Sequence, residues 1–101
     1  MIADVEERNG KYYALDDKNK EISRESKSSV GELLGNSSDF MVFEYNSKYY
    51  VRDEHFKEIS RDSKSSLGEF RNVSGSSINF TFGNKIYTRD EKLKEISRRP
   101  I

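Results

Sequence analysis

The sequence contains no cysteine, no tryptophan and only one proline, and its 18 basic and 18 acidic residues cancel to a net charge of +0. Without cysteine, the chain has no disulfide, no thiolate nucleophile and no cysteine-based zinc site. Without net charge, it has no field that would attract nucleic acid or an anionic membrane. No apolar run is long enough to cross a bilayer, and the polar first residues differ from a signal peptide. We therefore expect a soluble cytoplasmic protein with neither nucleic acid nor a membrane as partner.

What the chain does contain is a charged pentapeptide that occurs three times. The sequence Lys-Glu-Ile-Ser-Arg recurs every 37 residues, at 20–24, 57–61 and 94–98. Aligning 11–34 with 48–71 gives 15 identities in 24 positions, which establishes an internal duplication. We treat 1–101 as a single repeat domain made of units 1–27, 28–64 and 65–101.

Within a unit, the residue pattern is typical of short strands separated by turns. Residues 39–45 are rich in apolar side chains, the next three suit a hairpin turn, and 48–51 is aromatic and β-branched. Asp53 suits the first position of a tight turn, after which Lys-Glu-Ile-Ser returns as a strand. Each complete unit is therefore predicted to be an antiparallel meander of about four strands, joined to the next by a flexible polar Ser-Lys-Ser-Ser connector.

The position of each strand in its sheet follows from its charges. Charged flanks protect a sheet edge, so we place Lys-Glu-Ile-Ser-Arg outermost in every sheet. The middle strand has apolar groups on both sides of the backbone, with Tyr49 and Val51 on one and Tyr50 on the other. We expect that strand to be covered on both faces.

The predicted fold is all-β, with three tandem antiparallel meanders of 37 residues arranged like propeller blades and the first unit lacking one strand. The strand face that carries Met41 and Phe43 in the second unit carries Asp4 and Glu6 in the first. A polar outer face is typical of the terminal unit in a stack of repeats. A compact β-trefoil, which is also built from three units, is the alternative.

The unit resembles the tryptophan–glycine repeat of many bacterial proteins. That signature has a turn of Asn-Gly-Lys, an aromatic pair position, an aspartate three residues on, and then Gly-Lys-Glu-Ile; here Asn9, Gly10, Lys11, Tyr12, Asp16, Lys20, Glu21 and Ile22 follow it. Two tyrosines stand where Trp-Gly would be, and Asn19, Phe56 and Leu93 replace the glycine before Lys-Glu-Ile. The resemblance implies a β-repeat binding or scaffold module without catalytic apparatus.

The candidate ligand-binding residues are the repeated tyrosines and aspartates, namely Tyr13, Asp16, Tyr50, Asp53, Tyr87 and Asp90. Exposed tyrosines could stack on sugar rings, but on half-buried strands tyrosines more often join the core, with the hydroxyl reaching a partner. The aspartates could hold calcium near one end of the assembly, but capping of the turns accounts for them without a ligand. We favour turn capping and therefore predict no metal and no cofactor.

No catalytic residue is predicted. His55 is the only histidine and has no partner at a spacing that suits metal binding or acid–base chemistry. No nucleophile–base pair is visible. Arg24 with Lys27, and Arg61 with Lys64, lie among hydroxyl groups and could form an anion site, but a flexible polar connector is the interpretation that we favour.

These observations favour a non-enzymatic β-repeat module that binds or scaffolds a protein partner. The partner could also be a second copy of the chain in a homodimer, because we expect Ile96 and Ile101 on the exposed side of the last unit. One alternative is a carbohydrate-binding module with repeated sites. Another is an engineered or consensus repeat protein with no ligand, because the copies are nearly identical.

Overall fold

The computed structural model describes all residues from Met1 to Ile101 and consists almost entirely of β-strands. The elements are β1 (Asp4–Arg8), β2 (Lys11–Leu15), β3 (Glu21–Ser26), α1 (Lys27–Val30), β4 (Glu32–Asn36), β5 (Phe40–Tyr45), β6 (Lys48–Asp53), β7 (Glu58–Ser63), α2 (Lys64–Leu67), β8 (Glu69–Ser74), β9 (Ser77–Phe82), β10 (Lys85–Arg89) and β11 (Glu95–Pro100). Neither helix has the length or the apolar character needed to span a lipid bilayer.

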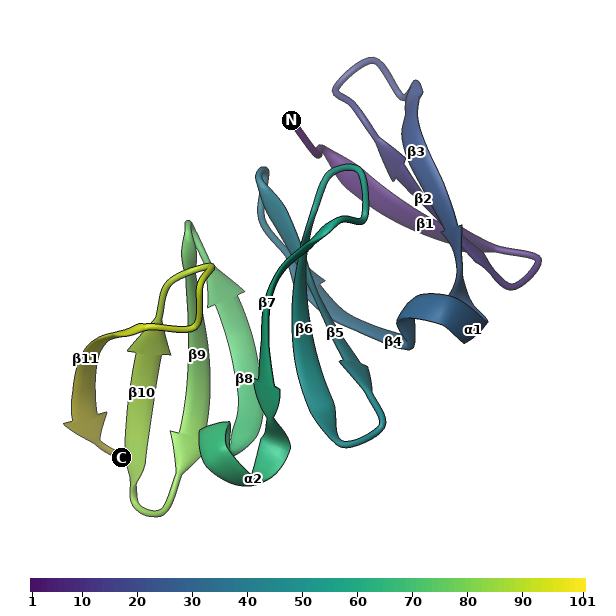
Figure 1. Ribbon diagram of the computed structural model, residues 1–101. Helices are drawn as coiled ribbons and strands as arrows, with labels where there is room; N and C mark the ends of the chain where they lie inside the picture. Colours follow the sequence, from purple (N-terminus) through teal and green to yellow (C-terminus); the bar gives the residue numbers. More distant parts are fainter.

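The strands form three separate antiparallel sheets that follow one another along the chain (Figure 1). Sheet A contains β1 to β3, sheet B contains β4 to β7, and sheet C contains β8 to β11. The prediction of an all-β fold with one three-stranded and two four-stranded meanders is confirmed. The β-trefoil alternative is wrong, because every strand pairs only within its own sheet and no barrel is shared between units.

The Lys-Glu-Ile-Ser-Arg strands lie where their charges predicted, since β3, β7 and β11 each form one edge of a sheet. Two of these edges end in an amide that is bound by a neighbouring carboxylate: Glu25 accepts from the Ser26 N–H at 3.0 Å, and Asp62 accepts from the Ser63 N–H at 2.7 Å. The third edge has Pro100 at the corresponding position, which has no N–H to offer. One amide at the end of each outer edge is therefore unavailable to a further strand, and the charged flanks of these strands also disfavour its addition.

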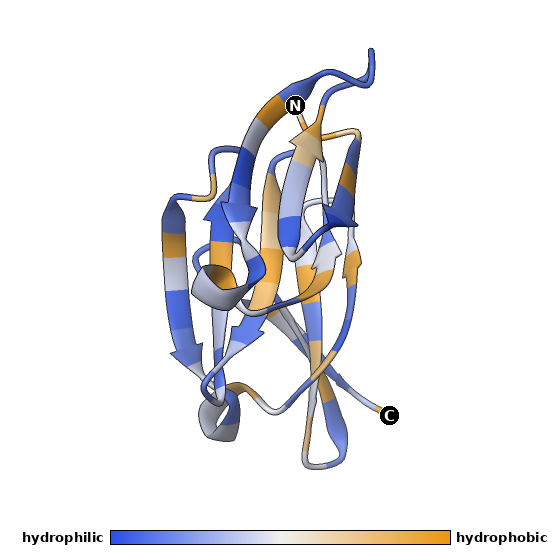
Figure 2. Cartoon of the chain, turned by 90° about the vertical axis from the view of Figure 1, so that its right-hand side faces the viewer, coloured by the Kyte–Doolittle hydropathy of each residue, from blue (hydrophilic) through white to orange (hydrophobic).

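Two apolar cores lie between the sheets. The core between sheets A and B contains Ile2, Tyr12, Ala14, Val30, Met41, Phe43 and Phe56. The core between sheets B and C contains Phe40, Val42, Tyr49, Val51, Leu67, Ile78, Phe80 and Leu93. Figure 2 shows the hydrophobic residues running along the central strands, with hydrophilic residues on the outer ones. Sheet B is thus the only sheet with an apolar core against both faces.

The same tyrosine contact joins each sheet to the next. The buried Tyr49 hydroxyl of sheet B donates to the Gly68 carbonyl oxygen at 2.7 Å and accepts from the Phe70 N–H at 3.0 Å. Tyr12 of sheet A makes the corresponding pair of bonds to Gly31 and Leu33, both at 3.0 Å. The expectation that core tyrosines use their hydroxyl to reach a partner is confirmed for these two residues.

The expected coverage of the middle strand on both faces is only partly correct. Tyr49 and Val51 are fully buried between sheets B and C, but Tyr50, on the opposite face, is only half-buried. The same holds for Tyr13 in sheet A. Each of these tyrosines lies on the face that points away from the following sheet, where the packing is less extensive.

The two outermost faces of the stack are polar. The outer face of sheet A carries Asp4, Glu6 and Arg8, as predicted. On the outer face of sheet C, the positions that hold Val42 and Val51 in sheet B hold Asn79 and Thr88. Thr88 donates to Asn79 Oδ1 at 2.6 Å, and Asn79 donates to the Asn72 side chain at 2.8 Å. This network makes the last face hydrophilic at its centre.

The Ser-Lys-Ser-Ser connectors are ordered, which corrects the expectation of flexible links. Each folds into one helical turn, and the apolar residue that follows the serines is buried, Val30 in α1 and Leu67 in α2. Gly68 then adopts φ of 93°, and a Cβ there would lie 2.2 Å from the Thr81 carbonyl oxygen. Only glycine therefore fits at the end of this turn.

The turn before each Lys-Glu-Ile strand also needs a left-handed residue. Asn19, Phe56 and Leu93, which replace the glycine of the tryptophan–glycine signature, have φ of 63°, 62° and 63°. Asparagine tolerates this conformation, but a large apolar side chain pays about 1–2 kcal/mol for it. The burial of Phe56 and Leu93 in the two cores offsets this strain. Asn19 belongs to the first sheet, so no preceding sheet packs against it, and it is exposed.

Candidate functional site: the tyrosine–arginine clusters

The predicted site tyrosines each lie between arginine side chains. In sheet B, Tyr50 has the Arg52 guanidinium carbon at 5.4 Å from its ring centroid and that of Arg61 at 5.8 Å. The corresponding distances are 4.3 Å for Arg8 and 5.4 Å for Arg24 around Tyr13, and 5.7 Å for Arg89 and 5.2 Å for Arg98 around Tyr87. We call each group of one tyrosine and two arginines a tyrosine–arginine cluster.

Strand register builds each cluster. Tyr50 lies directly opposite Arg61 across the β6–β7 pair, and Arg52 follows Tyr50 by two residues and so shares its face of the sheet. Arg52 is held further by a 2.9 Å hydrogen bond from Nη1 to the Phe56 carbonyl oxygen. Its Nε is buried without a hydrogen-bond partner, as is that of Arg89. Register, ring stacking and this bond keep the guanidinium groups in fixed positions.

The outer arginine of each cluster also forms an ion pair within its own strand. Arg24 Nε is 3.0 Å from Glu21, Arg61 Nε is 3.2 Å from Glu58, and Arg98 Nε is 2.8 Å from Glu95. The hydrogen bond to the glutamate raises the pKa of Arg24 and of Arg98. The Arg61 side chain is 55% exposed, and its terminal nitrogens make no hydrogen bond within the protein. Those N–H groups can therefore donate to a ligand.

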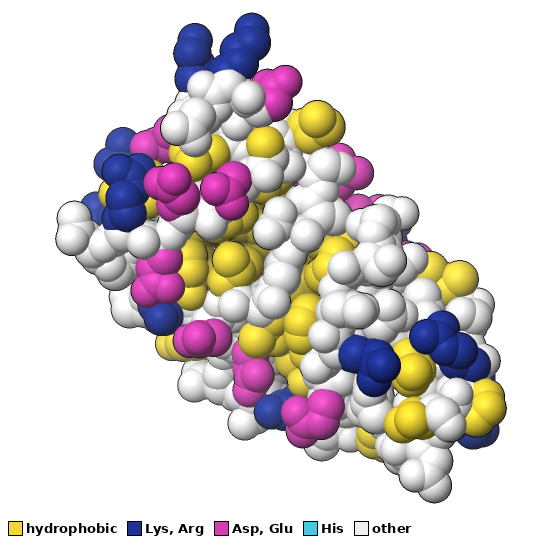
Figure 3. Space-filling model, turned by 180° about the vertical axis from the view of Figure 1, so that it is seen from behind, with side chains coloured by type: hydrophobic (Ala, Val, Ile, Leu, Met, Phe, Trp, Pro, Cys, Tyr) yellow, Lys and Arg dark blue, Asp and Glu magenta, His cyan; other side chains and the backbone are white.

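An exposed aromatic ring extends the cluster in sheets B and C. Tyr45 packs edge-on against Tyr50 at 6.4 Å and is 38% exposed, and Phe82 packs edge-on against Tyr87 at 6.2 Å and is 46% exposed. In sheet A the corresponding residue is Arg8. Figure 3 shows basic and hydrophobic side chains side by side at the sheet C end of the molecule. Guanidinium and apolar surface are thus presented together.

The predicted site aspartates do not join these clusters. Asp53 Oδ1 accepts the N–H of His55 at 2.8 Å and of Lys57 at 3.0 Å. Asp16 accepts the N–H of Lys18 and of Lys20, both at 2.9 Å, and these backbone bonds lower its pKa. Asp90 accepts equivalent bonds from Lys92 and Lys94 at 2.9 and 3.0 Å. All three therefore cap their turns, as the preferred interpretation held.

Calcium binding by a ring of aspartates finds no matching geometry. Nowhere in the chain do three histidine, aspartate or glutamate side chains come together in a group that could hold a metal ion. No hydrogen bond joins Tyr13 to Asp16, Tyr50 to Asp53 or Tyr87 to Asp90. The structure thus separates the two halves of the predicted site.

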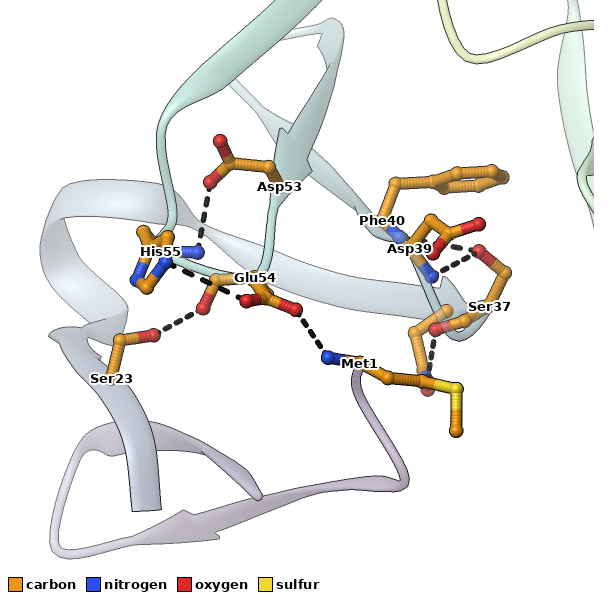
Figure 4. A network of polar contacts seen from close by, with 9 residues as sticks. Met1, Ser23, Ser37, Asp39, Phe40, Asp53, Glu54 and His55 are labelled. Carbon is orange, nitrogen blue, oxygen red and sulfur yellow. Dashed lines mark hydrogen bonds and ion pairs between the residues drawn. The ribbon is translucent and has the colours of Figure 1, made fainter. Parts of the chain in front are cut away.

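His55 lies in an exposed turn between sheets A and B (Figure 4). Its Nε2 is 3.6 Å from Glu54, whose other carboxylate oxygen is 2.6 Å from the amino group of Met1. The hydrogen bond that the Met1 amino group donates to Glu54 raises the pKa of this amino group. The Glu54 carbonyl oxygen also accepts a hydrogen bond from the Ser23 hydroxyl of sheet A. The group therefore fastens sheet A to the turn of sheet B.

The lysines that follow the outer arginines have partners of their own. Lys27 Nζ lies 3.2 Å from Glu7 and 3.6 Å from Glu32, and Lys64 Nζ lies 3.4 Å from Glu44 and 3.7 Å from Glu69. The hydrogen bond to Glu7 raises the pKa of Lys27. An anion site shared with Arg24 or Arg61 would require these lysines, but both already form ion pairs with carboxylates of the protein.

The role of the arginines beside the tyrosines was missed in the sequence. Arg52 and Arg89 both stand two residues after a site tyrosine. In a strand, that spacing places the two side chains on the same face. Arg61 could have been found as well by aligning the two strands of the hairpin.

Comparisons with protein-family models, with curated proteins and with solved structures found no match. The resemblance to tryptophan–glycine repeats therefore stays a prediction from the residues.

Proposed function

We infer that this protein is a non-enzymatic binding module that recognises another protein through the tyrosine–arginine clusters of sheets B and C. The observation that carries this inference is the exposed aromatic ring beside each cluster, Tyr45 in sheet B and Phe82 in sheet C. Tyrosine, phenylalanine and arginine are among the residues enriched in protein interfaces, and tyrosine and arginine are among the commonest hot spots. The strands hold them rigidly, which lowers the entropy lost on binding.

The carbohydrate alternative is supported less well by the same geometry. Sugar rings stack on open aromatic faces, but arginine guanidinium groups lie over Tyr13, Tyr50 and Tyr87. The aspartates that would bind sugar hydroxyls are already engaged in their turns.

A selection experiment tests the protein-binding function. A displayed library of random peptides is selected against the wild-type chain, and the enriched peptides are measured against a Tyr45→Ser/Phe82→Ser double variant. We expect binding to be lost in the variant, while its circular dichroism spectrum stays that of the wild type. The matched control is Arg71→Ser, because Arg71 is a large exposed side chain on β8 that lies outside the clusters.

The same selection can refute the function. If the enriched peptides bind the double variant as well as the wild type, the clusters are not the site. A parallel glycan array addresses the carbohydrate alternative, because sugar binding without peptide binding would replace the proposed function. A blank in both experiments would favour a consensus repeat with no ligand.

Self-association is a second candidate, supported by the outer face of sheet C. Ile22 and Ile59 pack against the cores, but the corresponding Ile96 is 58% exposed, and Ile101 is 72% exposed. Light scattering over a concentration series measures it directly. A mass that rises to twice that of one chain, and falls back in Ile96→Asp, would support a homodimer; a constant single-chain mass would remove it.

A further inference from the structure

The charge pattern of the clusters in sheets B and C identifies the chemistry of a partner. Each cluster presents an exposed arginine next to an exposed aromatic ring, Arg61 beside the Tyr50–Tyr45 pair and Arg98 beside the Tyr87–Phe82 pair. An arginine fork binds a carboxylate with two parallel hydrogen bonds, while an aromatic ring offers apolar contact. The complementary surface alternates single carboxylates with apolar groups.

We propose that each of these two clusters binds an acidic, extended segment of a partner protein, with a carboxylate on Arg61 in the first and on Arg98 in the second. This proposal rests on the proposed function and specifies the partner. The clusters belong to neighbouring sheets and repeat the same residues in the same register, so each offers an acidic segment the same chemistry.

The glutamates of the clusters distinguish a peptide from a polyanion. Glu58 and Glu95 already neutralise part of the charge of Arg61 and Arg98, and the chain as a whole has a net charge of +0. Nucleic acid or a sulfated polysaccharide needs a basic field, which these carboxylates weaken. Isolated carboxylates separated by apolar residues avoid that repulsion and use the exposed rings.

Other surfaces of the molecule fit a partner less well. Strand addition at the outer edges is limited by the bound amides of Ser26 and Ser63 and by Pro100. On β1 the Val5 N–H is bound by the Asp4 carboxylate at 2.8 Å. The outer face of sheet C satisfies its own polar groups through Asn79. The clusters in sheets B and C combine exposed aromatic rings with guanidinium N–H groups that can still donate. These are the terminal nitrogens of Arg61 and Nη1 of Arg98, whose Nε and Nη2 bond Glu95 at 2.8 and 3.1 Å.

The test is an NMR titration of the full chain with two synthetic peptides. The first is built of Glu-Pro-Phe repeats, which stay extended, and the second has Gln in place of every Glu. The observed signals are the side-chain N–H groups of Arg61 and Arg98 and the ring protons of Tyr45 and Phe82. We expect the acidic peptide to shift these signals and the Gln peptide to bind several-fold more weakly.

Arginine-to-lysine variants locate the contact, because they keep the charge and remove the fork. Arg61→Lys and Arg98→Lys are each expected to weaken binding at their own cluster about threefold, and the double variant should weaken binding at both clusters, as for exposed ion pairs. Arg71→Lys is the matched control, because Arg71 is exposed on β8 outside the clusters. It should bind like the wild type.

Three results would overturn the proposal. The first is equal affinity for the Glu and Gln peptides. The second is unchanged affinity in the Arg61→Lys/Arg98→Lys variant. The third is stronger binding of heparin or of poly-glutamate than of the Glu-Pro-Phe peptide, which would indicate a response to charge density alone. If the selected library peptides instead bind the clusters and are neutral or basic, the partner chemistry is wrong but the protein-binding function stands.

Discussion

Removing a single hydroxyl group, in Tyr49→Phe, should destabilise the fold strongly. The Tyr49 side chain is 0% exposed, and its hydroxyl bonds both the Gly68 carbonyl oxygen and the Phe70 N–H. The substitution keeps the ring contact with Phe80 at 5.0 Å but leaves two backbone groups without a partner. Each unsatisfied buried group costs about 1–3 kcal/mol, so we expect a loss of about 2–4 kcal/mol.

Urea denaturation followed by circular dichroism measures this loss. With a slope of about 1–2 kcal/mol per molar urea, the midpoint should fall by about 1–2 M. Tyr12→Phe should behave similarly, because Tyr12 makes the same two bonds to the next sheet. Tyr50→Phe is the control: no hydrogen bond joins its hydroxyl to the protein, so its midpoint should hardly move. Equal midpoints for Tyr49→Phe and Tyr50→Phe would refute the reasoning.

The ionisation of Tyr49 gives an independent check. Burial raises the pKa of Tyr49 above its ordinary value of 10.0. A raised folded-state pKa means that the contribution of the neutral hydroxyl is fully present below about pH 10 and is lost as the pH rises through the folded value. The wild type should therefore lose stability at high pH more steeply than Tyr49→Phe does. Identical alkaline profiles would contradict this assignment.

Three further substitutions probe the turns. Phe56→Gly removes the backbone strain of a φ of 62° but also removes a buried ring. Thermal unfolding should therefore show a net loss of stability of about 2–3 kcal/mol. Asn19→Gly, at the exposed equivalent position, should change the stability little. Gly68→Ala places a Cβ against a β9 carbonyl and should lower the stability by more than about 2 kcal/mol. Gly75→Ala, whose Cβ meets open space, should lower it by about 1 kcal/mol. Equal melting temperatures for the two variants would contradict this reasoning. The pKa of Asp16 is lowered in the folded state, so its carboxylate stabilises the fold when the pH lies above the ordinary pKa of 3.8. This stabilisation is lost as the pH falls through the folded-state pKa. Asp16→Asn should therefore flatten the acid limb of a stability–pH curve.

The sequence was sufficient to predict the sheets because the repeat reveals their boundaries. The spacing of 37 residues gave one meander per unit, and the charges of Lys-Glu-Ile-Ser-Arg placed that strand at an edge. The charges at Asp4 and Glu6 identified the polar face of the first sheet. Each of these inferences needs only local periodicity or a comparison between copies, and all of them agree with the structure.

The packing between sheets could not be predicted in the same way. Periodicity shows that a strand has two faces but not which neighbour each face meets. Tyr49 and Tyr50 are adjacent and identical in type, yet one is fully buried between sheets and the other lies beneath arginines. The difference depends on the direction in which the sheets stack. The same missing information hid the polar outer face of sheet C, although Asn79 stands at the position of Val42.

Of the residues that form the tyrosine–arginine clusters, the sequence pointed to the tyrosines and not to the arginines. The tyrosines were chosen because aromatic residues recur at one position, and the structure keeps them at the surface of each sheet. The aspartates were chosen for the same reason, but a turn can require a residue as regularly as a ligand can. Repetition alone therefore does not separate Asp53, which caps its turn, from Arg61, which lies beside a ring.

The near-identity of the interfaces also has a consequence for folding. Because Tyr12 and Tyr49 bond the next sheet through the same backbone groups, the hydrogen bonds cannot tell sheet A from sheet B as a neighbour of sheet C. Side-chain volume can: the first core combines the small Ala14 with the large Phe56, and the second combines Val51 with Leu93. Sheet C docked directly on sheet A would place Leu93 against Ala14, in place of the larger Phe56, and leave a void. A chain misassembled in this way would have to undock sheet C before sheet B could enter, which makes a slow refolding phase the expected kinetic signature.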